Sequence, residues 1–188
     1  MRVVGVEDGG FIRRPFSINA QKTFLVCAVF EGLWLSECLI EKITVDGLDA
    51  TKKLVELLQN TSFDILMLAG VSFAGFNVID AKTVSETFTK PVVIVCRTKP
   101  DNLAVKNALR KHFRDWEKRW ATFKKLGPIY RIATKPYRGS VYVELVGAKL
   151  EWVKGLLNAF TVLGKTPEPL RVARLIARGL TRIDSRLM

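Results

Sequence analysis

Acidic residues follow three strand-like segments of the chain. The segments read RVVGV, EKITV and LMLAG, and the carboxylates after them are Glu7, Asp8, Asp46, Asp49 and Asp80. Because carboxylates at strand ends can converge, and because Mg²⁺ and Mn²⁺ prefer oxygen ligands on rigid elements, the pattern predicts a metal site. Two such ions can activate water and stabilise a phosphodiester leaving group. Asp-Gly at positions 8–9 and 46–47 is equally typical of turns.

Arginines recur at helical spacing near the end of the chain. They are Arg171, Arg174, Arg178, Arg182 and Arg186, and on one continuous helix they form a single stripe opposite an apolar face. Like charges on one face repel each other unless an anion neutralises them, and a phosphate backbone would do so. The alternative is a solvated face whose arginines pair with surface carboxylates.

A second basic segment follows Asp101. Apolar residues advance by three and four from Val105 to Phe123, which predicts one long amphipathic helix that ends at Gly127. Trp116 and Trp120 fall at core spacing, so we expect packing rather than base stacking. The basic residues expected on the solvated side are Lys106, Arg110, Lys111, Arg114, Lys118, Arg119, Lys124 and Lys125.

Bulk composition favours an anionic partner. The chain has 188 residues, is 48% hydrophobic and carries a formal charge of +12, which suits nucleic acid or an anionic membrane surface. No apolar run approaches the roughly 20 residues of a membrane span, and the polar opening is no signal peptide. We therefore expect a cytoplasmic protein with nucleic acid as partner. Its oligomeric state and the choice between DNA and RNA stay open.

The sequence lacks the signatures of several enzyme classes. Three widely spaced cysteines, Cys27, Cys38 and Cys96, argue against a disulfide framework and a zinc site. Neither GxxxxGK[ST] nor GxGxxG occurs, which disfavours nucleotide-dependent kinases and dehydrogenases. The G-x-S-x-G elbow of esterases is also absent.

The elements that must position these residues are those of an α/β protein. Two strands, Thr23–Phe30 and Leu33–Val45, are joined by Glu31-Gly32, which predicts an antiparallel hairpin. The apolar runs Phe63–Ala69 and Pro91–Cys96 suit buried parallel strands separated by a crossover helix. A mixed sheet with helices on both faces follows, in a single domain over residues 1–188. Further helices are expected after the Asp49-Ala-Thr segment, where Asp49 or Thr51 could cap the first, over Lys149–Leu163, and from Pro169.

Five motifs in order carry a resemblance that covers nearly the whole chain. They are GVEDG, VDGLDAT, LAGVSFAGFNVID, PVVIVCR and PEPLRVARLIARG. Together they resemble an uncharacterised archaeal family that is similar to endonuclease V. The resemblance implies a ribonuclease H-like fold and an enzyme that uses Mg²⁺ or Mn²⁺ to cut near deaminated bases, chiefly inosine. It also implies that Asp8 and Asp49 are metal-binding and that Arg97 is the basic residue at a strand end.

Two departures from the endonuclease V pattern imply a degenerate metal site. The metal-binding aspartate of a strand-ending Asp-Gly pair aligns with Ala69, and a methyl group cannot hold a cation. Arg174 replaces an Asp or His that lies close to the metal, so a positive charge stands where a cation should sit. No wedge of the Tyr-Ile-Pro-Gly kind precedes Asp49.

Three hypotheses follow from these residues. The first is a nucleic-acid-binding protein with absent or weak nuclease activity, which contacts nucleic acid through Arg97, Arg171, Arg174, Arg178 and Arg182. The second is an active Mg²⁺- or Mn²⁺-dependent endonuclease in which Asp8 and Asp49 hold the ion with help from Asp46, Asp80 or Glu7. The third is a protein-interaction module whose arginine stripe docks an acidic protein, with no metal cofactor.

Overall fold

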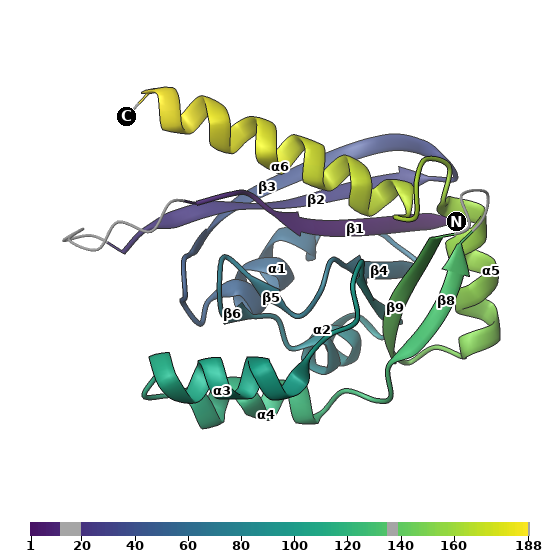
Figure 1. Ribbon diagram of the computed structural model, residues 1–188. Helices are drawn as coiled ribbons and strands as arrows, with labels where there is room; N and C mark the ends of the chain where they lie inside the picture. The colour runs from purple at the N-terminus through teal and green to yellow at the C-terminus, as the bar shows by residue number, and fades with distance from the viewer. Residues whose placement is uncertain (12–19, 135–138, 188) are drawn as a thin grey trace.

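The computed structural model describes residues 1–11, 20–134 and 139–187 (Figure 1). Its strands are β1 (Arg2–Asp8), β2 (Lys22–Glu31), β3 (Trp34–Thr44), β4 (Ile65–Leu68), β5 (Ser72–Phe73), β6 (Asn77–Val78), β7 (Val92–Cys96), β8 (Tyr130–Thr134) and β9 (Gly139–Val146). Its helices are α1 (Ala50–Leu58), α2 (Ala81–Phe88), α3 (Asn102–His112), α4 (Trp116–Lys124), α5 (Leu150–Phe160) and α6 (Glu168–Leu187).

A seven-stranded mixed sheet forms the centre, in the order β3-β2-β1-β4-β7-β9-β8. The strands β3, β2 and β1 are antiparallel neighbours, whereas β1, β4 and β7 run parallel. This confirms the predicted hairpin followed by parallel strands. The antiparallel strands β9 and β8 extend the far edge, and β8 was not predicted, nor was the separate β5–β6 hairpin.

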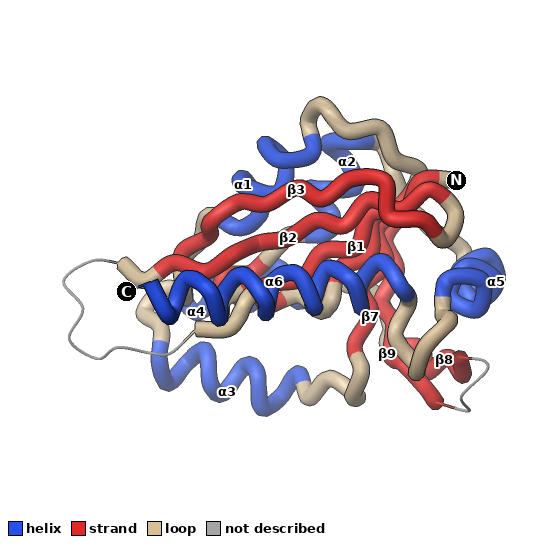
Figure 2. The backbone as a smooth tube through the Cα atoms, turned by 90° about the horizontal axis from the view of Figure 1, so that it is seen from above, coloured by secondary structure: helices blue, strands red, loops and turns tan. Residues whose placement is uncertain are grey.

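Helices cover both faces of the sheet, as predicted. Helix α6 crosses β1 and β2 on one face, with α5 at its end, while α1 to α4 lie on the other face (Figures 1 and 2). Successive side chains of a strand point to opposite faces, so Val3 packs with Ala173 of α6 while Val4 and Val6 pack with Leu54 of α1. Two hydrophobic cores result, one on each face.

The single long helix predicted after Asp101 is wrong, because the chain breaks at Phe113. That residue is extended, with φ −131° and ψ 126°, and it separates α3 from α4. Its ring meets the Phe76 ring edge-on at 5.5 Å and lies 4.3 Å from the guanidinium carbon of Arg119. These tertiary contacts are what the helical spacing of apolar residues cannot reveal.

The sequence predicted no membrane-spanning segment, and the helices of the structure can be compared with that prediction. Within residues 1–11, 20–134 and 139–187, no helix has both the length and the apolar run that a crossing requires.

Helix α6 approaches β1 closely at Gly5. A Cβ atom on Gly5 would overlap the main chain of Pro169 and Leu170. Glycine is therefore required by the close approach of helix and strand rather than by an unusual backbone angle.

We expect Gly5→Ala to lower the free energy of unfolding by about 3 kcal/mol, since the added methyl group pushes α6 away from the sheet. Urea unfolding followed by circular dichroism measures this. Gly179→Ala, within α6 itself, is the matched control, because a Cβ atom added at Gly179 would meet open space. It should stabilise the protein by up to about 1 kcal/mol through helix propensity. Equal stabilities of Gly5→Ala and the parent would contradict the packing described.

Candidate functional site

The β5–β6 hairpin gathers three of the acidic residues that the sequence singles out. The N–H of Ala74 donates to an Asp8 carboxylate oxygen at 2.6 Å, and the N–H of Phe76 donates to Asp46 Oδ1 at 2.9 Å. The Asn77 amide donates to Asp49 Oδ1. The structure thus brings Asp8, Asp46 and Asp49 around one hairpin at the carboxyl ends of β1 and β4, and each accepts a hydrogen bond from it.

Asp49 occupies the N-cap position of α1, as predicted, but its side chain makes no cap hydrogen bond. The carboxylate turns back instead and accepts from the Thr44 hydroxyl at 2.8 Å. Burial works to raise the pKa of Asp49, yet the hydrogen bonds from Asn77 and Thr44 outweigh it and hold the pKa below its ordinary value. The ionised Asp49 carboxylate therefore joins Thr44, at the end of β3, to Asn77 of β6.

Asp80 lies outside this group. It caps α2 by accepting from the Thr83 N–H at 3.1 Å, and its other oxygen pairs with the Lys125 ammonium group. Both contacts lower its pKa against the opposing effect of burial, which is the largest single influence. Asp80 therefore has a structural partner for each carboxylate oxygen.

The carboxylates as arranged do not fit a divalent-ion site. Such a site needs several oxygen ligands that converge on one point. Among the residues that the structure describes, no group of three or more His, Cys, Asp or Glu side chains is placed to hold a metal ion. The assignment of Asp8, Asp46, Asp49 and Asp80 as metal ligands stays a prediction. Both carboxylate oxygens of Asp49 and of Asp80 already accept from protein donors.

Glu7 lies on the opposite face of the sheet from Asp8 and faces α6. Its Oε1 is 3.7 Å from Arg174 Nε. Burial and the neighbouring Asp8 charge raise the pKa of Glu7 to about 8, against the attraction of Arg174, Arg178 and Arg97. The three arginines are therefore close enough to act on one carboxyl group at the end of β1. Sequence reasoning treated Glu7 as an accessory and missed this pairing.

The arginines of α6 differ in their surroundings. Arg171 is bound by Glu168, with its Nε 2.9 Å from both carboxylate oxygens. Arg174 is half-buried beside Glu7, whereas Arg178 and Arg182 are exposed. Leu170, Ala173 and Ala177 are buried on the inner side of the helix, as the spacing predicted. The side chain of Arg186 lies outside the described residues.

Arg119 was predicted on a solvated helix face, and this is wrong. Its side chain is 5% exposed, and its guanidinium donates to the carbonyls of Gly47 at 2.8 Å, Phe76 at 2.6 Å and Asp46 at 2.9 Å. A fourth bond, at 3.0 Å, reaches the carboxylate of Asp115. Arg119 thereby ties α4 to both loops that carry the acidic residues. It is one of eight Lys and Arg residues between Asp101 and Gly127, so no sequence signal distinguishes it.

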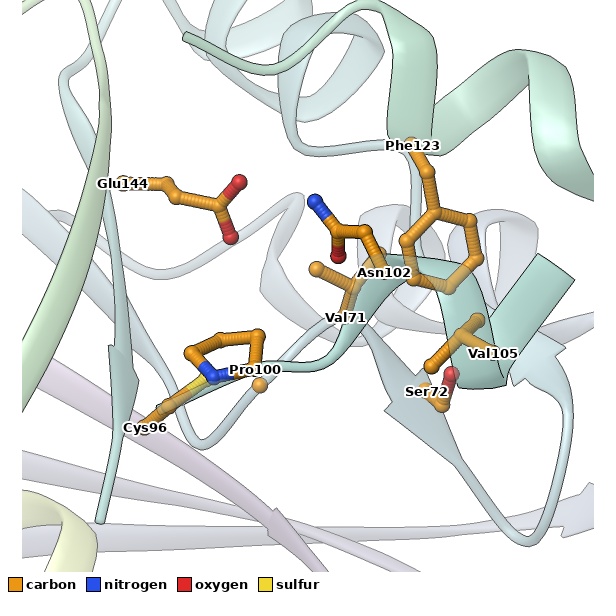
Figure 3. Close-up of a pocket in the computed structure, with 9 residues that line it drawn as sticks. Val71, Ser72, Cys96, Pro100, Asn102, Val105, Phe123 and Glu144 are labelled. Carbon is orange, nitrogen blue, oxygen red and sulfur yellow. The ribbon is translucent and has the colours of Figure 1, made fainter. Parts of the chain in front are cut away.

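A pocket of about 180 Å³ opens on the α3–α4 side of the sheet (Figure 3). Gly70 after β4, Cys96 of β7 and Glu144 of β9 line it from the sheet, and Asn102 and Phe123 line it from α3 and α4. Glu144 is 5% exposed, and burial raises its pKa to about 6. Burial and the Glu144 charge together raise the pKa of Cys96 to about 11, so Cys96 remains a thiol. Sequence reasoning missed Glu144, although a carboxylate inside the apolar strand VYVELV is itself a signal.

Comparisons with known proteins place this geometry in context. The family model for endonuclease dU matches residues 1–181. A UPF0215 protein of Methanothermobacter thermautotrophicus is 34% identical over 99% of this chain and 90% of its own. The crystal structure of an Archaeoglobus fulgidus protein of unknown function has a TM-score of 0.82 and 29% identity, covering 95% of this chain and 97% of that one.

The expected fold is confirmed by a more distant likeness. Endonuclease V of Ciona intestinalis, solved with DNA that contains inosine, has a TM-score of 0.61 at 13% identity. The match covers 97% of this chain and 87% of that one. The ribonuclease H-like fold predicted from the motifs is therefore correct.

We expect Glu144→Gln to change how stability depends on pH. Because the folded pKa of Glu144 is about 6 rather than 4.5, the folded state binds the proton more tightly. The parent therefore loses stability as pH rises from 4.5 to about 6 and loses no more above that. Relative to the parent, Glu144→Gln should gain about 2 kcal/mol between about pH 4 and pH 7.

Chemical unfolding at a series of pH values measures this gain. The same substitution at Glu86, an exposed residue of α2, is the control and should show no such gain. A pH-independent difference between Glu144→Gln and the parent would contradict the burial of an ionised carboxylate.

Proposed function

Because the chain belongs to the endonuclease dU family, which is archaeal and endonuclease V-like, we propose that it binds nucleic acid and has absent or weak nuclease activity. The membership confirms the family resemblance inferred from the motifs. The observation that carries the proposal is the meeting of Arg97, Arg174 and Arg178 around Glu7 at the end of β1. Arg174 and Arg178 of α6 act there on both Glu7 and Asp8, and Arg97, which follows β7, acts on Glu7. Three arginines therefore face two carboxyl groups, which leaves a surplus of positive charge.

Electrostatics supports a phosphate backbone as the partner. The chain carries a net charge of +12, and binding that releases condensed counterions from nucleic acid is favourable and salt-sensitive. Arg178 and Arg182 extend the positive surface along α6 beyond Arg174. The Ciona intestinalis protein that shares the fold was solved with bound DNA, which supports the same class of partner here.

Two residues support weak or absent cleavage. Ala69 follows β4 and packs against the core beneath α6, so it offers no ligand. Arg174 places a guanidinium against Glu7, where an ion would need negative charge. Binding does not need the carboxylate that is missing at Ala69, and Arg174 adds a cation that attracts phosphate, so binding can persist where hydrolysis is lost.

The second candidate is an active Mg²⁺- or Mn²⁺-dependent endonuclease. The description of the family as endonuclease dU favours it, and strands that contain dU join inosine-containing strands as candidate substrates. In that case Asp8 could offer the oxygen that does not accept from Ala74, whereas Asp49 would exchange bonds from Asn77 and Thr44 for a cation. The exchange at Asp49 makes the site costly to form.

We expect Arg178→Ala to weaken binding to a fluorescent single-stranded oligonucleotide, because an exposed cation on the stripe is lost. Fluorescence anisotropy at several salt concentrations should show the slope of log affinity against log salt falling by about 0.7 for one lost phosphate contact. Lys82→Ala, an exposed cation of α2 on the other face, is the control and should leave the slope unchanged. If the parent binds without any salt sensitivity, the nucleic-acid proposal is abandoned.

We expect no cleavage of dU- or inosine-containing strands by the parent above the level seen without divalent metal. Gel analysis with Mg²⁺ or Mn²⁺ tests this. Cleavage that requires the metal and disappears in Asp8→Asn would instead establish the second candidate. Cleavage that persists without metal, and in Asp8→Asn, would point to a contaminating nuclease.

A further inference from the structure

The edge of the sheet that β3 forms is exposed. Strand β3 ends the order of the sheet, so within the described residues no strand pairs with its outer side (Figure 2). Its one irregularity is a bulge before Glu37, and residues 37–44 pair regularly with β2. An uncovered regular edge presents N–H and C=O groups to another strand, and β3 has no proline that would prevent such pairing.

Apolar side chains gather at this edge. Twelve large hydrophobic side chains are exposed in the part of the chain that the structure describes, and five of them lie here. They are Met1, Leu33, Trp34, Leu35 and Ile40. Trp34 is 82% exposed, and the Met1 carbonyl accepts from the Gly32 N–H at 3.1 Å, which places Met1 beside the turn. Single exposed apolar residues are ordinary, but a cluster of this kind marks an interaction surface.

Helix α6 extends this surface on one face of the sheet. It packs on β1 and β2, and Arg174 turns toward Glu7 at the end of β1. Ile183 follows Arg174 by nine residues, or two and a half helical turns, so it lies on the opposite flank, toward β3. Its side chain is 60% exposed, and its neighbour Asp184 pairs with Lys42 of β3 at 3.7 Å. The apolar surface therefore continues from β3 to α6.

The charges of β3 are balanced within the chain. The three pairs are Glu37 with Arg2 at 3.6 Å, Glu41 with Lys53 at 3.8 Å and Lys42 with Asp184 at 3.7 Å. A phosphate backbone binds where cations are in excess, and these pairs leave no excess. In a chain of net charge +12, two copies repel each other over most of their surface, so a locally neutral edge is where they can meet.

We propose that β3 is a self-association surface, to which a second copy of this chain adds its own β3 in antiparallel orientation. The two sheets then form one continuous sheet about a two-fold axis, the commonest symmetry of homo-oligomers. Main-chain hydrogen bonds join the copies, and the apolar side chains of the edge are removed from water. The interface lies away from the arginines beside Glu7, and the inference does not rest on the proposed function.

The charges of β3 determine the register of that pairing. With Ile40 on the axis and opposite its own copy, Leu39 faces Glu41 and Glu37 faces Ile43, so no like charges stand opposite each other. An axis one residue earlier sets Glu37 opposite Glu41, and an axis one residue later sets Glu41 opposite itself. Like charges directly opposite are destabilising. Ile40, which is 44% exposed, is therefore the centre of the interface.

The size of the surface predicts a modest affinity. Strand β3 has 11 residues, so its edge is about 37 Å long, and a strip roughly 10 Å wide buries about 370 Å² per copy. The flank of α6 adds a strip of about 300 Å². Together they reach the roughly 600 Å² per partner of small but specific interfaces. We therefore expect a dimer that forms at micromolar concentrations.

Sedimentation equilibrium, with and without nuclease treatment, tests the inference. The parent should pass from the monomer mass to twice that mass as its concentration rises from about 1 to 100 μM. Ile40→Lys sets two like charges on the axis and should weaken the dimer at least about tenfold. Ile40→Glu should do the same. An equimolar mixture of the two variants should restore the dimer, because the opposite charges on the axis then attract each other.

Leu103→Lys is the matched control, because it makes the same kind of change at a residue of α3 that is 70% exposed, and it should dimerise as the parent does. Hydrogen exchange of the parent is a second measurement, since amides within residues 37–44 should exchange more slowly where the mass has doubled.

Three results would overturn the inference: a parent that stays monomeric, an Ile40→Lys variant that dimerises as the parent does, or a mixture of the two variants that stays monomeric. If nuclease treatment abolishes the doubled mass, nucleic acid joins the copies and the inference is likewise overturned. Each of these results leaves the proposed binding of nucleic acid as it stands.

Discussion

The buried guanidinium of Arg119 is the interaction on which the candidate site depends. Charge is costly to bury unless every donor finds an acceptor, and here three main-chain carbonyls and one carboxylate accept from the same group. The carbonyls belong to the turn after β3 and to the β5–β6 hairpin. The turn after β3 contains Asp46 and Asp49, and the β5–β6 hairpin donates a hydrogen bond to Asp8. Helix α4 in turn supplies Phe123 as one wall of the pocket. One cation therefore fixes loops, hairpin and helix relative to one another.

Much of the fold was predictable because local pattern and tertiary environment agree. Continuous apolar runs in β2, β4 and β7, the two-residue turn between β2 and β3, and the residue spacing of α6 each indicate an element without knowledge of its neighbours. The break at Phe113 was not predictable, since its apolar side chain satisfies the helical period and the reason for the break is contact with Phe76. Strand β8 alternates in burial over only five residues, which is too short a signal on its own, so its pairing with β9 determines it.

The site was less predictable than the fold, because residue type does not reveal a partner. Glu7 and Asp8 are adjacent carboxylates in the sequence, yet strand geometry sends one toward Arg174 and the other toward Ala74. Asp49 was correctly placed at the start of α1, but its hydrogen bonds run to Thr44 and Asn77. Glu144 could have been found from its place within an apolar strand, whereas Arg119 could not, because it lies in a run of basic residues.

The antiparallel run of β9 has a consequence for how the pocket keeps its shape. A parallel strand presents only its end at this edge of the sheet, but β9 runs past it. Glu144 pairs with Ile94 of β7, and its neighbour Val143 pairs with Tyr130 of β8. A group on such a strand keeps its position whatever the neighbouring loops do. Replacement of that one side chain therefore changes the chemistry of the pocket, while the surrounding backbone stays as it is.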